Sequence, residues 1–246
     1  MYDKIYDFCK VRNLGSIYKN GTVETPRVKF LIELTEMLGL TPELHVFSVR
    51  EDTQGFNIVL RGSSNKIITA HHDIVNPNID NANDNSASVI NAIAAKLLKP
   101  EITVVLLDGE EVGGLGSQYL SDQINGGEFG EIDWVLNLEL TGRGGSTFFI
   151  GNYPGKLSDH IRGIFDCPIV STPFNDSVIF RDNGIDSVVI NPLPILEEGT
   201  SHVKWGESYL DYEMLFHCHT KKDTLDTIRV EDMQKFVEEV IIPIVS

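Results

Sequence analysis

The spacing of apolar residues along the chain predicts an alternation of helices and strands. A helix is expected to begin at Pro26, because leucines follow it at helical spacing and Gly39 ends the pattern. Residues 66–71 have the composition of a strand. Residues 89–98 then form a single apolar stripe of helical period, which stops before Pro100. The first half of the chain therefore follows a strand–helix order.

The same order continues through the middle of the chain. Residues 102–107 are almost continuously apolar, which is typical of a parallel strand covered on both faces. A glycine-rich loop leads from them into a predicted helix over 117–124. Residues 133–140 alternate between two faces and predict a further strand. Residues 148–151 and 187–191 predict two more, so the pattern is that of a doubly wound sheet.

The two ends of the chain complete a predicted single domain over residues 1–246. Apolar positions within 233–244 recur at steps of 3 and 1, which predicts an amphipathic closing helix. Helices within about residues 1–40 are expected to pack on the sheet. No repeat or linker divides the chain. Residues 192–216 are the least regular part and predict a loop that covers a site.

The excess of acidic over basic residues limits the classes of partner that the protein can bind. Lys and Arg number 20 against 36 Asp and Glu, for a net charge of −16. This balance argues against nucleic acid and against an anionic membrane as partners, because both would be repelled. The chain is 41% hydrophobic, without an apolar run near 18 residues, which predicts a globular protein. Most of the carboxylates are expected on a solvated surface.

The cysteines and the N-terminal segment bear on the compartment. Cys9, Cys167 and Cys218 are too few, and odd in number, to form a disulfide framework. The first 16 residues carry charges throughout and lack the apolar stretch of a secretory signal. A reducing compartment and a cytoplasmic location are therefore the expectation.

Candidate chemistry follows the predicted strands. In open α/β sheets, ligands bind beyond the carboxyl ends of the strands. The polar segments at these strand ends are His71-His72-Asp73, residues 81–86, residues 108–111, Glu139 and, later in the chain, residues 217–220. Several carboxylates on one rim repel one another unless cations lie among them. Histidine nitrogens with carboxylate oxygens suit zinc, with manganese or cobalt as alternatives.

Position within a strand distinguishes the neighbouring groups. Residues i and i+2 share a strand face, so Asp73 is expected to orient the ring of His71 while His72 points away. Of the pair Glu110 and Glu111, one carboxylate can bind metal while the other takes a proton from water. A Glu-Glu pair on its own is also typical of a solvated loop. Cys218, between two histidines, is a further possible ligand.

Five motifs in this order resemble those of the co-catalytic dizinc exopeptidases of the bacterial leucyl aminopeptidase and glutamate carboxypeptidase type. The motifs are His71-His72-Asp73, residues 82–88, residues 108–117, Asn137-Leu138-Glu139 and residues 219–224. The order and spacing agree over roughly residues 65–230. The resemblance implies a three-layer α/β/α domain with a mixed, mostly parallel central sheet.

The resemblance also implies roles for the site residues. Asp84 would bridge two zinc ions, one completed by His71 and Glu139. Glu111 and His219 would complete the other, with Glu110 as the general acid and base and Asp73 supporting the catalytic site. A cis peptide bond between Asp84 and Asn85 is a further implication. The expected activity is that of an aminopeptidase acting on a peptide or small amide.

Departures from the family pattern leave alternatives open. Where the family often has Ser-Asp-His, this chain has Asn175-Asp176-Ser177, so substrate specificity is not transferred. A glutaminyl-cyclase-like acyltransferase with one zinc shares the fold. An inactive binding domain is a third possibility, although all six key positions hold competent residues. The sequence leaves the oligomeric state open.

Overall fold

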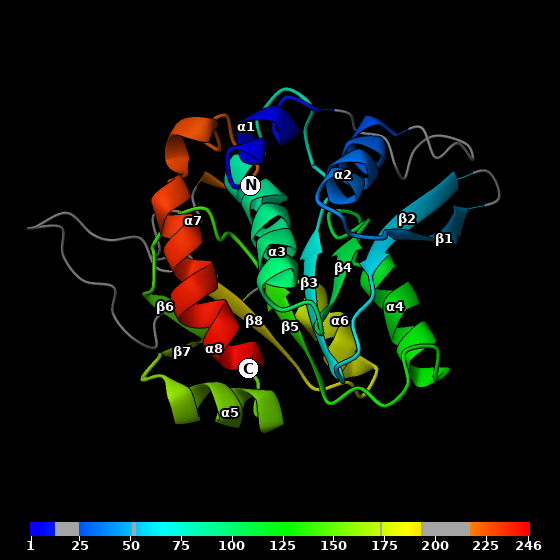
Figure 1. Cartoon of the computed structure of the whole chain (residues 1–246), viewed down its shortest axis with the longest axis vertical. Coiled ribbons are helices and arrows are strands. Elements are labelled where there is room, and N and C mark those ends of the chain that lie inside the picture. Colours follow the sequence, from blue (N-terminus) through cyan, green and yellow to red (C-terminus); the bar gives the residue numbers. More distant parts are fainter. Residues whose placement is uncertain (13–24, 51–52, 173, 193–216) are drawn as a thin grey trace, which may run out of the picture.

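A mixed sheet forms the centre of the computed structural model (Figure 1), which describes residues 1–12, 25–50, 53–172, 174–192 and 217–246. Within these residues the sheet has eight strands, in the order β1-β2-β4-β3-β5-β8-β6-β7. The strands are β1 (Glu43–Arg50), β2 (Thr53–Leu60), β3 (Lys66–His71), β4 (Thr103–Leu107), β5 (Trp134–Leu138), β6 (Phe148–Gly151), β7 (Ile169–Val170) and β8 (Ser187–Pro192). The central strands β4, β3, β5 and β8 are parallel, whereas β2 and β6 join them antiparallel.

The register of the parallel strands places their carboxyl ends at one edge. His71 is paired with Leu107, so the residues that follow β3 and β4 emerge side by side. Thr69 is paired with Asn137, which places Glu139 level with His71 across the β3–β5 pair. In Figure 1 the arrowheads of β3 and β4 point to the edge near α1 and α2. The polar residues that the sequence predicts at the strand ends therefore lie along the same edge of the sheet.

Helices cover both faces of the sheet. One face carries α1 (Lys4–Phe8), α2 (Pro26–Met37), α3 (Ala87–Leu98), α5 (Lys156–Ile164), α7 (Val230–Phe236) and α8 (Ile242–Val245). The other face carries α4 (Leu115–Asn125) and α6 (Asp176–Asp182). The π-helical segment η5 (Val237–Ile241) joins α7 to α8 into one continuous rod. The predicted three-layer α/β/α class is thus confirmed.

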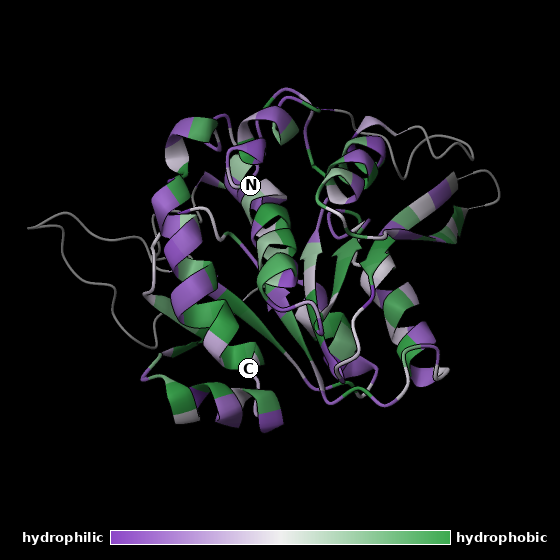
Figure 2. Cartoon of the chain, viewed as in Figure 1, coloured by the Kyte–Doolittle hydropathy of each residue, from purple (hydrophilic) through white to green (hydrophobic). Residues whose placement is uncertain are grey.

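Two apolar cores explain why the central strands are hydrophobic on both faces. In β4, Val104 and Leu106 belong to the core under α3, whereas Val105 and Leu107 belong to the core under α4 and α6. Figure 2 shows α3 and the central strands as mostly hydrophobic. Burial of both faces accounts for the unbroken apolar run in this part of the sequence. The central strands are therefore packed on both faces up to the edge where their carboxyl ends lie.

Most predicted elements are present, and some observed ones escaped prediction. The helix from Pro26 and the closing helix are confirmed, with Gly39 following the former at a φ of +78°. The hairpin β1–β2 and the helices α5 and α6 were not predicted. The predicted covering loop at 192–216 lies outside the described residues, apart from Pro192, the last residue of β8.

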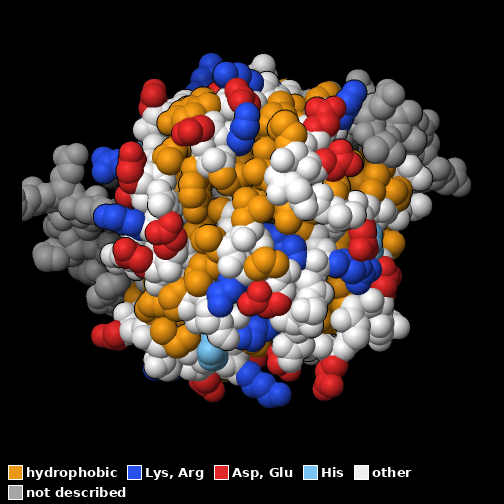
Figure 3. Space-filling model, viewed as in Figure 1, with side chains coloured by type: hydrophobic (Ala, Val, Ile, Leu, Met, Phe, Trp, Pro, Cys, Tyr) orange, Lys and Arg blue, Asp and Glu red, His pale blue; other side chains and the backbone are white. Residues whose placement is uncertain are grey.

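The surface agrees with the charge pattern. Asp and Glu side chains are scattered over the face shown in Figure 3, interspersed with Lys and Arg. In the part of the chain that the structure describes, no helix combines the length and the apolar character needed to cross a membrane.

Candidate metal centre

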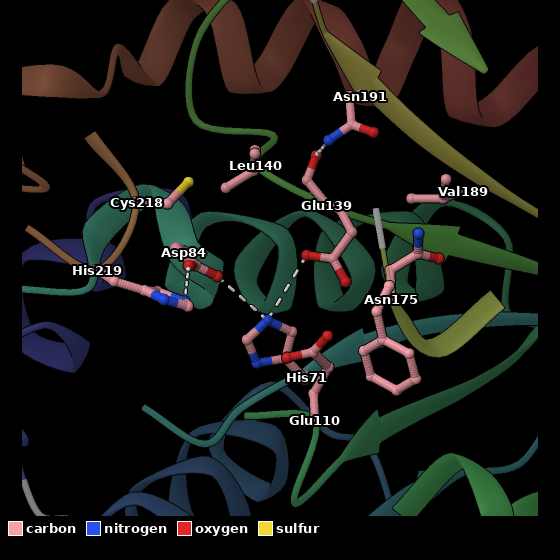
Figure 4. Close-up of a pocket in the computed structure, with 11 residues that line it drawn as sticks. His71, Asp84, Glu110, Glu139, Leu140, Asn175, Val189, Asn191, Cys218 and His219 are labelled. Carbon is pink, nitrogen blue, oxygen red and sulfur yellow. Dashed lines mark hydrogen bonds and ion pairs between the residues drawn. The ribbon is translucent and has the colours of Figure 1, made fainter. Parts of the chain in front are cut away.

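Six side chains from separate segments meet at the carboxyl edge of the sheet. His71 ends β3, and Glu139 comes directly after β5. Asp84 lies in the turn η1 (Ala82–Ser86) that precedes α3. The remaining three come from the loop after β4 and from the segment before η4 (Leu225–Thr227), and they are Glu110, Glu111 and His219. Figure 4 shows five of the six around one pocket, all but Glu111. The structure thus brings together all the residues that the family resemblance implied as ligands and base.

The first cluster consists of His71, Asp84 and Glu139, all buried. The Nε2 atom of His71 lies 3.3 Å from Oδ1 of Asp84 and 3.6 Å from Oε2 of Glu139. One potential ligand atom from each of the three residues lies within 4.8 Å of the others. One imidazole nitrogen and two carboxylate oxygens at this separation can surround a single cation.

The second cluster shares Asp84 with the first. The Nε2 atom of His219 lies 3.1 Å from Oδ2 of Asp84 and 3.0 Å from Oε2 of Glu111. Asp84 therefore turns a different carboxylate oxygen toward each histidine. The arrangement of Asp84 between the two histidines suits a carboxylate that bridges two cations.

A third group, of His71, Glu110 and Glu111, is also compact enough to hold an ion.

The titration behaviour of these groups shows the excess of negative charge. Burial, together with the charges of Asp176 and Glu139, raises the pKa of Glu110 to about 10. Burial and the charge of Asp84 likewise raise the pKa of Glu111. Hydrogen bonds to Asp84 and Glu111 raise the pKa of His219 to about 10. Without cations, the cluster therefore retains protons at neutral pH.

The donor set fits a metal ion of the zinc type. Although burial opposes its ionisation, the hydrogen bonds of His219 and His71 hold the pKa of Asp84 below its usual range. Among the described residues, the buried Oε1 atom of Glu111 has no hydrogen-bond partner. A buried carboxylate oxygen of this kind is costly unless a cation or a donor satisfies it. Nitrogen and oxygen ligands from His, Asp and Glu are those that zinc uses.

Asp73 connects two parts of the centre. Its Oδ1 atom lies 3.3 Å from Nδ1 of His71, which agrees with the predicted orienting role. Its carboxylate also accepts hydrogen bonds from the backbone N–H groups of Glu110, at 3.2 Å, and Glu111, at 3.1 Å. The latter contacts have no signal in the sequence, since they cross from β3 to the loop after β4. Asp73 thus holds the backbone of the glutamate pair and lies next to the ring of His71.

Glycines allow this loop to turn. Gly109 and Gly113 have φ values of +80° and +107°, which favour glycine. Gly116 packs so close to the backbone of Asp108 that a Cβ atom would meet its carbonyl oxygen at 2.3 Å. The glycine-rich motif therefore shapes the turn that carries Glu110 and Glu111.

Further side chains hold the ligands in place. Glu139 accepts hydrogen bonds from the amides of Asn137, at 3.1 Å, and Asn85, at 2.8 Å. The carboxylate of Asp223 accepts the backbone N–H groups of Asn83, at 2.8 Å, and Asp84, at 3.1 Å. The bond between Asp84 and Asn85 is cis, as the motif implied. Ligand orientation is thus set by a surrounding layer of hydrogen bonds.

The remaining predicted candidates lie apart from the clusters. His72 is fully buried, and its Nε2–H donates to the carbonyl of Phe56 at 2.8 Å. It therefore points away from His71, as the strand periodicity predicted. Cys218 lines the pocket beside His219 but belongs to none of the compact groups found among the described residues.

A cavity of about 360 Å³ opens beside the two clusters. His71, Asp84, Glu110, Glu139 and His219 line one part of it. Among the described residues, the rest of the wall is uncharged and consists of Leu140, Phe174, Asn175, Val189, Asn191 and Cys218. Phe174 is half exposed, with 50% of its surface accessible. A small substrate can therefore lie against the clusters and an apolar wall at once.

Comparison with known sequences gives a family match over most of the chain. The sequence profile of Peptidase family M28 matches residues 57–242. A probable leucine aminopeptidase 2 from Aspergillus oryzae is 25% identical in an alignment of 218 residues, and the match covers 76% of this chain. It covers 44% of the fungal protein, so the chain spans less than half of that relative.

Solved structures of enzymes with two different activities share this fold. A zinc aminopeptidase from Bacillus subtilis superposes with a TM-score of 0.61 at 22% identity, covering 79% of this chain and 50% of that one. A glutaminyl cyclase from Porphyromonas gingivalis superposes with a TM-score of 0.70 at 20% identity. The second comparison covers 99% of this chain and 97% of the cyclase. At these identities the likeness establishes the fold alone.

Proposed function

Because the chain belongs to Peptidase family M28, we propose that it is a metallopeptidase with two zinc ions that removes N-terminal residues from peptides or hydrolyses small amides. The observation that carries the proposal is the position of Asp84 between two histidines. Its Oδ1 and Oδ2 atoms lie 3.3 and 3.1 Å from the imidazoles of His71 and His219. One carboxylate placed in this way can serve two cations.

In this proposal each zinc has one histidine and carboxylate oxygens. His71 and Glu139 complete the ligands of one ion, and Glu111 and His219 complete those of the other. Manganese or cobalt could replace zinc with the same ligand types. When bound, zinc supplies Lewis-acid chemistry, which polarises the scissile carbonyl and makes water acidic near neutral pH.

Glu110 is the proposed general acid and base. Its carboxylate lines the cavity next to His71 and is largely shielded from solvent. With two cations nearby, the ionised form is favoured, and the carboxylate can take a proton from the attacking water. The same proton then goes to the leaving amine. Asp73 supports this step because it fixes the backbone at Glu110.

The walls of the cavity favour the amino end of a substrate. The carboxylates that line it attract an ammonium group. Recognition of a terminal carboxylate calls for Arg or Lys, and none lines this cavity within the described part of the chain. Leu140, Val189 and Phe174 suit an uncharged side chain. We therefore place an N-terminal residue, rather than a C-terminal one, against this wall.

A screen of fluorogenic aminoacyl amides tests the proposal. The protein is first stripped with a chelator and then assayed alone and with zinc, manganese or cobalt. Hydrolysis should depend on added metal and should favour apolar over acidic aminoacyl groups. Hydrolysis that persists unchanged in excess chelator would rule out the metal-dependent mechanism.

A second candidate function is the cyclisation of N-terminal glutamine with a single zinc ion. The specific observation in its favour is size, because the chain matches nearly the whole length of the glutaminyl cyclase. The two activities differ in metal content and in product. A glutaminyl peptide that loses ammonia without loss of a residue, at one zinc per chain, would favour the cyclase.

A further inference from the structure

Arg27 is a buried cation next to the metal centre but outside the region that matches the family. It lies in the first turn of α2, whereas the family match begins at residue 57. Only 3% of its surface is exposed. The negative charges of Asp73 and Asp108 act on its guanidinium group, which stacks 3.8 Å from the centre of the Phe8 ring. A buried charge of this kind needs a full set of hydrogen bonds.

The acceptors of Arg27 come from the two segments that carry His71 and Asp84. Its Nε–H donates to the carbonyl of His72 at 2.7 Å, one residue after a proposed ligand. Its Nη2–H donates to the hydroxyl of Ser86 at 3.1 Å, two residues after the bridging aspartate. Arg27 therefore links the end of β3 to the η1 turn. These are the segments whose side chains meet at 3.3 Å in the first cluster.

A third hydrogen bond of Arg27 connects it to the N-terminal segment that follows α1. The Nη1–H of Arg27 donates to the carbonyl of Val11 at 3.0 Å, just beyond α1. The backbone N–H of His72 is in turn bound to the carbonyl of Leu107, at 2.7 Å, on β4. Both polar groups of the His72 backbone are thus fixed. The guanidinium group of Arg27 adds a hydrogen-bonded link from this residue to the η1 turn.

We propose that Arg27 is a positioning residue for the metal centre, which it serves by holding the His71 and Asp84 segments at ligand distance from each other. This inference rests on the metal centre of the proposed function. Its positive charge also interacts with the negative charge of Asp73, which lies next to His71. The N-terminal helices would then contribute to metal binding although they supply no ligand.

The zinc affinity of the Arg27→Met variant tests this role. The dissociation constant is measured by competition with a chromophoric chelator at a temperature where circular dichroism shows the variant folded. Loss of a group that orients ligands should raise the zinc dissociation constant about 10- to 100-fold. Arg27→Lys keeps the charge and some of the bonds, so it should recover part of the affinity.

Lys96 offers a matched control. It is also a buried cation, with 4% of its surface exposed, and its Nζ donates to the carbonyls of Arg61, Pro100 and Ile102. These contacts lie near the start of β4, at the opposite edge of the sheet from the metal centre. Lys96→Met should lower the melting temperature but leave the zinc dissociation constant unchanged.

A second variant covers the case in which Arg27→Met does not fold. Ser86→Ala removes a single acceptor of Arg27 and should raise the zinc dissociation constant by a few-fold. Wild-type zinc affinity in Arg27→Met, or in Ser86→Ala where the former is unfolded, would overturn the inference. A wild-type protein that binds no zinc would instead overturn the proposed function, so the two failures are distinguishable.

Discussion

Asp223 holds the backbone of Asp84 from a position 139 residues further along the chain, with its Oδ2 atom accepting the Asp84 N–H at 3.1 Å. Its other oxygen accepts the N–H of Asn83 at 2.8 Å. One buried carboxylate thus fixes two consecutive peptide groups of the turn that carries the proposed bridging ligand. The C-terminal segment that supplies His219 also supplies this support.

Replacement of Asp223 should therefore weaken metal binding. In Asp223→Ala both backbone N–H groups lose their acceptor, and the zinc dissociation constant should rise about 10- to 100-fold. Asp186→Ala is the control, since Asp186 also accepts a backbone N–H, that of Leu157 at 2.8 Å, but at the start of β8. Equal zinc affinities for the two variants would refute the role of Asp223.

The proposed base can be separated from the proposed ligands. Glu110→Gln retains the size of the side chain but cannot take a proton, so turnover should fall by about 10²- to 10⁴-fold. Zinc content, measured by atomic emission, should stay at the wild-type value. Near-normal turnover would exclude Glu110 as the base, and loss of zinc would indicate that it is a ligand.

Phe174 should act on substrate binding rather than on chemistry. It lines the cavity and is half exposed. Phe174→Ala should raise KM for apolar aminoacyl amides several-fold and change kcat little, because the lost contact is shared by ground and transition states. Steady-state kinetics across aminoacyl groups measures this, and a fall in kcat at constant KM would contradict it.

His72 predicts how stability depends on pH. Burial lowers its pKa from 6.5 to about 4, so the folded protein binds fewer protons than the unfolded chain between these values. Stability is therefore fully present above pH 6.5 and is lost as the pH falls toward 4. The slope from this group is at most about 1.4 kcal/mol per pH unit.

His72→Gln isolates this contribution, because a glutamine amide can donate to the carbonyl of Phe56 but does not titrate. Free energies of unfolding in urea are compared at pH 7, 6 and 5 with chelator present. The advantage of the wild type over the variant should shrink as the pH falls. If the difference in free energy of unfolding between the two proteins stays constant over this range, His72 has the same pKa in the folded and unfolded chains, and the prediction is wrong.

The periodicity of the sequence predicted the centre of the fold and missed its edges. Strand β4 was evident because both of its faces are buried, so nearly every residue is apolar. Strand β2 was not predicted because Asn57, although buried, interrupts the apolar pattern. The Asn57 amide donates a hydrogen bond to the carbonyl of Gly116 at 2.9 Å. The seven residues of α6 are too few to establish a helical period.

The candidate site was predictable to the extent that it lies at strand ends. Parallel register brings His71 and Glu139 together, and the spacing of the motifs selects their partners. The supporting contacts were not predictable, because they depend on which distant backbone groups meet in three dimensions. The bonds from Asp73 to the glutamate pair and from Arg27 to His72 are of this kind.

Zinc titration of the metal-free protein, with hydrolysis of an aminoacyl amide followed at each addition, tests the central claim most directly. Two clusters that share Asp84 predict no hydrolysis without metal and a rise that reaches its plateau at two equivalents of zinc per chain. Full hydrolysis at one equivalent, or without any metal, would contradict a two-zinc centre.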